Sequence, residues 1–155
     1  IDRANGSVSD CSFLERNAER IANGVSVNAC KLAFDNVRVT GMLGTGISVE
    51  AASQVLVRKS RFERNAVAIS AADLSKVHVE GNNFLGNTLV FRASHDRNQR
   101  GGILLVYSNE FIDNTKERDA DESSEITNVA IFDQKVLGLF GIAVEPPPIV
   151  RRKRR

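Results

Sequence analysis

Apolar residues recur along this chain at a fixed interval of 22 positions. Four of them share the interval: Val25, Ile47, Ile69 and Phe91. Each is followed two positions later by another apolar or small residue, and these partners are Val27, Val49, Ala71 and Ala93. Alternation with a period of two places both members of a pair on one face of a short strand. An interval of this length indicates stacked structural repeats.

Each repeat contains two further apolar features. A second alternating pair follows the first, at Leu32/Phe34, Val55/Val57, Val77/Val79 and Leu104/Val106. Five residues after the last member of such a pair comes a large apolar residue, and the set is Phe13, Val39, Phe62, Phe84 and Phe111. The sequence therefore predicts three short strands in every repeat.

Small polar residues fall at fixed places between these strands. Three residues beyond the phenylalanines lie Asn65, Asn87 and Asn114, and midway between the second and third strands lie Cys11, Val37, Ser60, Asn82 and Asn109. Small polar side chains that stack at a turn can satisfy backbone groups of the next coil. We expect two ladders of such side chains along the molecule.

A repeat with three strands and three turns can close into one coil of a solenoid, with neighbouring coils about 4.8 Å apart. The pattern Val-x-Val-x-x-Asn-x-Phe-x-x-Asn of residues 77–87 resembles the parallel β-helix repeat of the pectin-lyase-like superfamily. The resemblance covers roughly residues 6–114. It implies an all-β fold, a right-handed parallel β-helix solenoid of about five 22-residue coils.

A leucine-rich repeat is the alternative fold, because residues 77–84 also fit the strand segment of that family. The other half of the repeat distinguishes the two folds. Residues 46–49 and 68–71 alternate with a period of two, whereas a leucine-rich repeat is expected to become helical there or to show Leu-x-x-Leu spacing. The pattern favours the β-helix.

Three segments depart from the regular interval, and such insertions map to surface loops. They are residues 18–23, 94–102 and 115–125, and we expect the highly charged last one to be a solvated loop. The pattern predicts one more strand at residues 126–132. It also predicts a final strand, or a cap over the open end of the stack, at Val136–Val144. We therefore predict a β-helix domain at residues 1–145 and a disordered proline-rich, basic tail at residues 146–155.

The composition fits one globular domain, since 42% of the 155 residues are hydrophobic. The net charge is +2, but five basic residues end the chain, which leaves 16 basic against 19 acidic residues before them. Because the chain before these five residues is mildly acidic, we expect no nucleic-acid partner. No apolar stretch reaches the roughly 20 residues of a membrane span. Because the chain begins with Ile1 and shows no signal sequence, we expect it to be part of a longer protein.

The outer face of the first strands is where enzymes of the resembling superfamily place their chemistry. Outward positions there are predicted to be Ser26, Ser48, Ser70, Arg92 and Glu50, which are our candidate ligand-binding residues together with Arg100. A calcium-dependent lyase needs several carboxylates side by side, and a glycoside hydrolase needs at least two. Glu50 is the one carboxylate that we find on this face, so we expect no metal and no cofactor.

The insertion at residues 94–102 carries the candidate catalytic residues His95, Asp96 and Arg97. They bear a loose likeness to the motif of alginate epimerases and lyases. That likeness implies a histidine or Tyr107 as acid or base and an arginine that neutralises the uronate carboxylate. The same residues also fit a polar surface loop that has no catalytic role. The sequence leaves open whether the protein is an enzyme.

The leading hypothesis is a polysaccharide-associated β-helix module of an extracytoplasmic protein, extracellular or in the cell envelope, that binds an extended glycan along its strand face. A uronate epimerase or polysaccharide lyase is the first alternative. A noncatalytic scaffold for protein partners is the second, and it would show an exposed apolar patch. The sequence does not define the oligomeric state.

Overall fold

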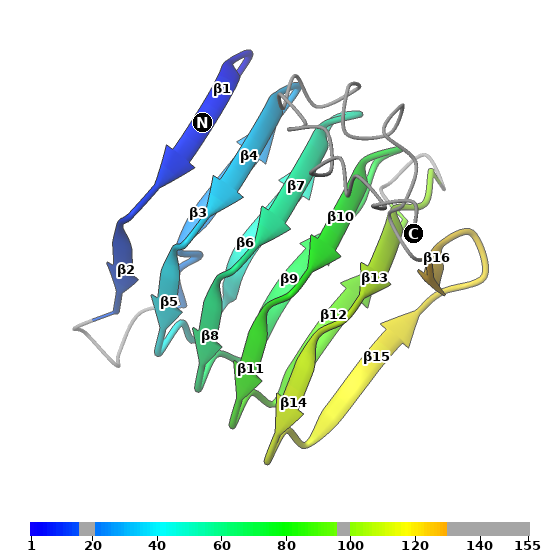
Figure 1. Cartoon of the computed structure of the whole chain (residues 1–155). Helices are drawn as coiled ribbons and strands as arrows, with labels where there is room; N and C mark the ends of the chain where they lie inside the picture. The colour runs from blue at the N-terminus through cyan, green and yellow to red at the C-terminus, as the bar shows by residue number, and fades with distance from the viewer. Residues whose placement is uncertain (16–20, 96–99, 130–155) are drawn as a thin grey trace, which may run out of the picture.

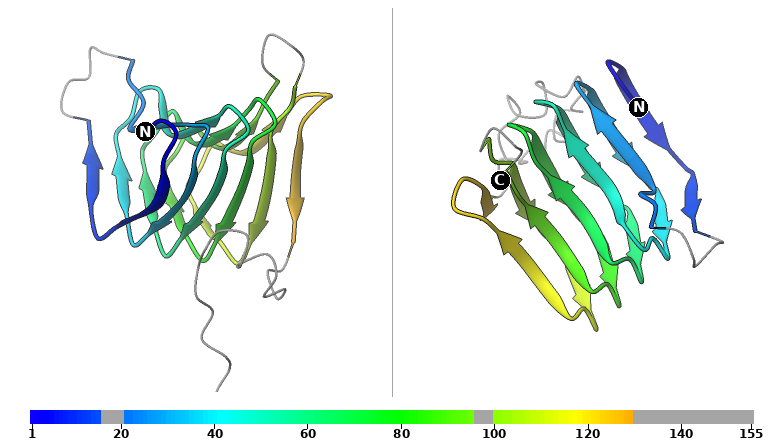
Figure 2. Two further views of the ribbon diagram at one scale, coloured as in Figure 1. Left: turned by 90° about the horizontal axis from the view of Figure 1, so that it is seen from above. Right: turned by 180° about the vertical axis from the view of Figure 1, so that it is seen from behind.

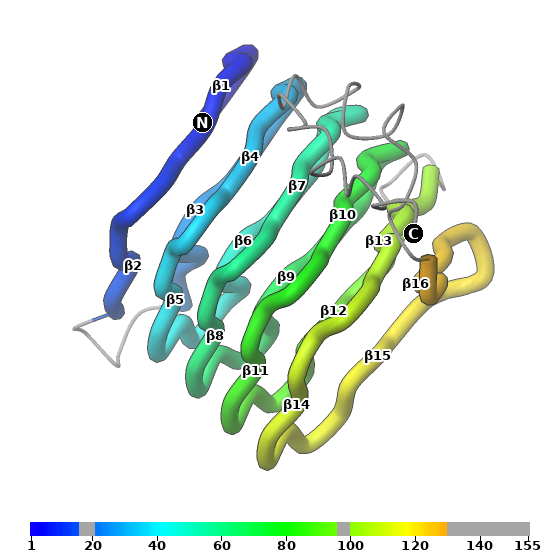
Figure 3. Tube along the Cα trace, viewed as in Figure 1, coloured from blue at the N-terminus to red at the C-terminus, as the bar shows by residue number. Residues whose placement is uncertain are grey.

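The computed structural model describes residues 1–15, 21–95 and 100–129, which wind into a solenoid of parallel strands (Figure 1). Three sheets run along the stack, and each full coil contributes one strand to each sheet. Figure 2 shows the coils stacked behind one another and enclosing a common interior. Figure 3 shows the same winding as a tube along the Cα trace.

The three sheets are named A, B and C in the order in which a coil visits them from its first predicted strand. Sheet A consists of β3 (Val25–Asn28), β6 (Thr45–Glu50), β9 (Val67–Ala71), β12 (Leu89–Ala93) and β15 (Lys116–Ala120). Sheet B consists of β1 (Asn5–Ser9), β4 (Lys31–Asp35), β7 (Gln54–Arg58), β10 (Lys76–Glu80), β13 (Ile103–Tyr107) and β16 (Glu125–Asn128). Sheet C consists of β2 (Ser12–Leu14), β5 (Arg38–Thr40), β8 (Arg61–Glu63), β11 (Asn83–Leu85) and β14 (Glu110–Ile112).

The strand register reproduces the repeat of the sequence. Ile47 pairs with Val25 on one side and with Ile69 on the other, and Ile69 pairs with Phe91. All three strands of the repeat are present, so the predicted parallel β-helix is confirmed and the leucine-rich repeat is wrong. The segments that alternate with a period of two form sheet A, where the alternative fold requires helix or loop.

The core consists of the inward side chains stacked on their equivalents in neighbouring coils. Val27, Val49 and Val57 are 0% exposed. The rings of Phe62 and Phe84 stack with their centroids 5.1 Å apart, and Phe111 continues the stack 5.7 Å beyond Phe84. Apolar contact therefore runs continuously from coil to coil.

Polar ladders follow all three corners of the coil. At the corner between sheets C and A, the Asn87 side-chain oxygen accepts hydrogen bonds from the backbone and the side chain of Asn65, and Asn114 does the same for Asn87. At the corner between sheets B and C, the Val37, Ser60 and Asn82 backbone amides donate to the next side chain along, which confirms both predicted ladders. A third ladder between sheets A and B links Cys30, Ser53 and Ser75, and the sequence reading missed it.

The prediction of a solvated loop at residues 115–125 is wrong, because residues 116–120 form β15. This strand pairs with β12 through its backbone, which needs no apolar side chains. The predicted strand at residues 126–132 is confirmed where the structure describes it, as β16. The expected cap at Val136–Val144, the domain boundary after residue 145 and the tail lie outside the described residues.

Alternation with Val77 and Val79 predicts that the side chain of His78 points away from the core and lies at the surface of sheet B. Its neighbours Val77 and Val79 are both in the core, which agrees with the outward direction. The residue itself is only 5% exposed, so the expectation of a surface position is wrong. Burial, with a smaller contribution from Lys76, lowers the pKa of His78.

Sheet C carries a buried ion-pair cluster on its outer side. The Glu63 side chain is 4% exposed and accepts a hydrogen bond of 2.7 Å from Arg38 Nη2 and another from Arg61 Nε. The hydrogen bond from Arg38, followed by that from Arg61, lowers the pKa of Glu63 against the opposing effect of burial.

We expect Glu63→Gln to reduce the free energy of unfolding at pH 7 by about 1–3 kcal/mol, because it removes charged hydrogen bonds at a buried position. A carboxyl whose pKa is lowered by folding contributes its full stability above the unfolded pKa, near 4.5, and loses it as the pH falls through the folded value. The difference between parent and variant should therefore shrink on acidification below that pH. Urea unfolding at several pH values measures this, with the exposed Glu110→Gln as control; a pH-independent difference would contradict it.

Candidate functional site

The candidate binding serines and Arg92 form one straight column on the outer face of sheet A. Adjacent members pair in register, in the order Ser26, Ser48, Ser70, Arg92 and Asp119. The Ser70 hydroxyl donates to the Ser48 hydroxyl at 3.2 Å, and the Ser48 hydroxyl donates to Glu50 Oε1 at 3.2 Å. Parallel register sets this arrangement, since equivalent positions of successive coils lie side by side.

The end of sheet A, where its strands lead toward sheet B, gathers charged residues beside this column. The ring nitrogen His95 Nδ1 lies 2.7 Å from Asp121 Oδ2, and the His95 backbone amide donates to the same oxygen at 2.5 Å. In the neighbouring turn, Arg100 Nη2 lies 2.6 Å from Asp73 Oδ1. The inserted segment is thus fastened at both of its described ends by carboxylates.

Asp121 is a carboxylate of this edge whose pKa is lowered. A hydrogen bond from the Ser124 side chain is the largest cause that lowers the pKa of Asp121, to about 2, and backbone hydrogen bonds from His95 and Ser123 add to it. The carboxylate is therefore ionised at neutral pH. It fixes the orientation of the His95 ring and directs the other ring nitrogen, Nε2, away from itself.

Arg92 differs from the other cations of this edge. Lys116 Nζ lies 2.7 Å from Asp119 Oδ1, which occupies the adjacent carboxylate and lowers the pKa of Asp119. Within the described part of the chain, Arg92 makes no ion pair of 4.0 Å or shorter, and its side chain is exposed. A guanidinium in this state can bind a carboxylate of a ligand with two parallel hydrogen bonds.

The structure brings some of the predicted site residues together and leaves others apart. The column at Ser26, Ser48, Ser70 and Arg92 is contiguous, with Glu50, His95 and Arg100 at its edge. Asp96 and Arg97 lie outside the described residues. Tyr107 lies at the far end of β13 from this edge, so it does not join the group.

Sequence reasoning missed three carboxylates of this edge: Asp73, Asp119 and Asp121. Asp119 and Asp121 lie within residues 115–125, which the sequence predicted to be a solvated loop. A signal was present, because Asp119 follows Arg92 by 27 residues, the same offset that separates Phe84 from Phe111. Extending the repeat at that offset would have placed Asp119 next to Arg92.

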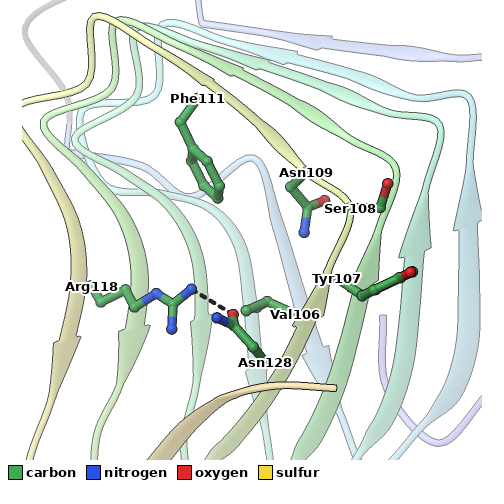
Figure 4. A pocket seen from close by; sticks show the side chains of 7 residues that line it. All are labelled: Val106, Tyr107, Ser108, Asn109, Phe111, Arg118 and Asn128. Carbon is green, nitrogen blue, oxygen red and sulfur yellow. Dashed lines mark hydrogen bonds between the residues drawn. The ribbon is translucent and has the colours of Figure 1, made fainter. Parts of the chain in front are cut away.

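A second concave region lies at the open end of the described stack, where Figure 4 shows Arg118 and Asn128 facing each other. Arg118 occupies the inward register position of Phe91, and Asn128 that of Val106. Arg118 Nη2 donates to Asn128 Oδ1 at 2.6 Å across a hollow of about 340 Å³. Polar groups at inward positions of the last coil disfavour further stacking on this end.

No group of three or more histidine, cysteine, aspartate or glutamate side chains suited to a metal ion occurs among the described residues. The same residues contain no helix whose length and apolar character would allow it to cross a membrane.

The comparison with known families agrees with this architecture. A family model described as "Right handed beta helix region" matches residues 1–137. The match covers most of the chain, so the chain belongs to the right-handed β-helix family. Neither the curated proteins nor the solved structures compared with the chain gave a match.

Proposed function

We propose that this β-helix is a carbohydrate-binding module that holds an extended acidic polysaccharide along the outer face of sheet A. The observation that carries the proposal is the straight column Ser26, Ser48, Ser70 and Arg92, whose arginine lies beside Asp119 in register and makes no ion pair of 4.0 Å or shorter among the described residues. The column crosses the strands, so its polar groups recur about every 4.8 Å.

The chemistry of the column suits a uronate polymer. The hydroxyl groups of the exposed Ser26 and the half-buried Ser70 can donate to and accept from sugar hydroxyls, whereas Ser48, at 6% exposed, supports Ser70 from beside it. The planar guanidinium of Arg92 matches a carboxylate. The surrounding carboxylates Glu50, Asp73 and Asp121 add acceptors for sugar hydroxyls at the edge. A module of this kind belongs outside the cytoplasm, in the extracellular space or the cell envelope, where such polymers occur.

Removing the cation is the first test of binding. We expect Arg92→Ala to weaken the binding of an acidic polysaccharide about tenfold or more, because a charged hydrogen-bonded pair is lost. A glycan array with alginate, pectin and neutral polymers identifies the ligand, and titration at two salt concentrations measures the loss. The exposed Arg64, at the corner after sheet C, provides the control variant Arg64→Ala. Unchanged affinity in Arg92→Ala, or no binding across the panel, would contradict the proposal.

The His95 and Asp121 pair favours a second candidate, a uronate epimerase or lyase. A carboxylate bonded to Nδ1 orients the imidazole so that Nε2 can transfer a proton, and Arg92 can neutralise the uronate carboxylate beside it. If the polymer that binds is also turned over, Asp121→Asn should lower kcat by about 100-fold or more while KM changes little.

The formation of unsaturated uronate ends, followed by their absorbance, measures lyase turnover, and proton exchange with labelled water measures epimerisation. His95→Ala should abolish either reaction and leave binding in place. Turnover that survives His95→Ala would exclude this pair as the catalytic group, and binding without turnover would support the noncatalytic module.

A further inference from the structure

The corner between sheets B and C carries three cations around a hollow in the surface. This hollow, called the corner hollow, has a volume of about 360 Å³. Its basic lining residues are Arg38 on β5, Lys59 directly after β7 and Arg61 on β8, and all three are exposed. No residue of the serine column on sheet A lines it, so the corner hollow is separate from the site proposed above.

Parallel register places two guanidinium groups side by side at this corner. Arg38 pairs with Arg61 of the adjacent strand, and β5 and β8 lie next to each other in the stack (Figure 1). Equivalent residues of neighbouring coils are about 4.8 Å apart. Alternation directs both arginines outward, because the residues that follow them, Val39 and Phe62, belong to the core. Like charges at such paired positions destabilise the sheet unless an anion lies between or beside them.

The buried carboxylate of Glu63 orients both guanidinium groups. Arg38 donates to it through Nη2 at 2.7 Å, and Arg61 donates through Nε. Within the described part of the chain, Nε and Nη1 of Arg38 and both Nη atoms of Arg61 make no hydrogen bond. The two arginine side chains remain 53% and 52% exposed. One carboxylate therefore fixes two cations but occupies only one nitrogen of each, which leaves the other nitrogens for a ligand.

Lys59 adds a third cation from the corner itself. Its equivalents in the two preceding coils are Asn36 and Asp10, and the Asn36 amide donates to Asp10 Oδ1 at 2.8 Å. Asp10 is thus two coils, about 10 Å, away from Lys59 along the stack. Glu80 lies beside Lys59 in a separate hollow of about 280 Å³. With the carboxylates that the structure describes, Lys59 makes no ion pair of 4.0 Å or shorter.

We propose that the corner hollow binds a tetrahedral oxyanion, a sulfate or phosphate group. Such a group offers three or four oxygens, and the three cations supply donors to it from two adjacent strands and from the corner. A carboxylate has two oxygens and would leave one of the cations unused. The bound charge also offsets the repulsion between Arg38 and Arg61. The group is carried by a sulfated polysaccharide or is a free ion, and the chemistry of recognition is the same.

Backbone amide NMR of the full chain tests the proposal and separates the two sources. The probes are inorganic sulfate, inorganic phosphate and sulfated dextran, with unsulfated dextran as the control, all at constant ionic strength. We expect saturable shifts of the Arg38, Lys59 and Arg61 amides. Saturation by the inorganic ions assigns a free ion, and saturation by sulfated dextran alone assigns an ester of a polymer. Shifts of the Ser26 and Ser48 amides report binding to sheet A, so the two proposed sites are distinguished in one titration.

Two lysine variants separate a specific site from general attraction between charges. Lys59→Gln should weaken the binding of the sulfate or phosphate group about fivefold, because it removes one of the three cations. Lys76→Gln removes the same charge from an exposed position on sheet B and should leave the affinity unchanged. Equal weakening by the two variants would overturn the proposal. The absence of saturable shifts at this corner with all three anionic probes would overturn it as well.

Discussion

Replacement of Val57 by aspartate is expected to lower the free energy of unfolding by more than about 4 kcal/mol and to leave little folded protein. Val57 is 0% exposed and lies in register between Phe34 and Val79, so its side chain is surrounded by core residues of its own coil and of both neighbours. A carboxylate there has no hydrogen-bond partner. Because the coils are stacked, the damage extends to the contacts on both sides.

The control for this experiment lies on the same strand. Gln54 is exposed and points outward, so Gln54→Asp should change stability by no more than about 0.5 kcal/mol. Circular dichroism during urea unfolding compares the two variants with the parent chain. If Val57→Asp unfolded at the same urea concentration as Gln54→Asp, the inward assignment of the whole second strand would be wrong.

The fold could be predicted because the sequence contains several copies of one repeat. A single short strand such as β9 has little to distinguish it from a buried helical turn. Its alternation becomes decisive when Ile47, Ile69 and Phe91 share an interval, since parallel register converts that interval into direct contact. The same reasoning located the asparagine ladder, because equivalent turns stack as equivalent strands do.

The parts that sequence reasoning missed are those whose structure depends on neighbours rather than on their own pattern. β15 is a strand because β12 offers an unpaired edge, while its own residues are charged and mostly exposed. His78 lies outward as predicted, but alternation does not reveal what covers an outer face. The serine ladder between sheets A and B was missed because Cys30, Ser53 and Ser75 precede the strands and carry no apolar spacing of their own.

In the candidate site too, the repeat predicts some contacts and not others. The column from Ser26 to Arg92 could be predicted from the 22-residue interval alone. The pairing of His95 with Asp121 could not, because it joins an inserted segment to the following coil, where the interval becomes 27 residues. An insertion shifts every later contact, and the shift has to be applied before residues of the next coil are placed.

Replacement of Asn87 by alanine is expected to cost about 3 kcal/mol, although it removes no apolar group from the core. Asn87 is 0% exposed and occupies the middle of the asparagine ladder. Its side-chain nitrogen donates to the Phe62 carbonyl at 3.0 Å and to Asn114 Oδ1 at 3.0 Å. Its oxygen accepts from the backbone and the side chain of Asn65, at 3.0 Å each. The alanine variant leaves several of these groups buried without a partner.

The end of the same ladder supplies a matched comparison. Asn114 donates to the Phe84 carbonyl and accepts from Asn87, but it is only half-buried because the described ladder ends there. Water can replace part of what is lost, so Asn114→Ala should cost about half as much. Equilibrium urea unfolding of both variants measures the difference. Equal losses would contradict the expectation that these hydrogen bonds cost more to lose where the ladder is fully buried.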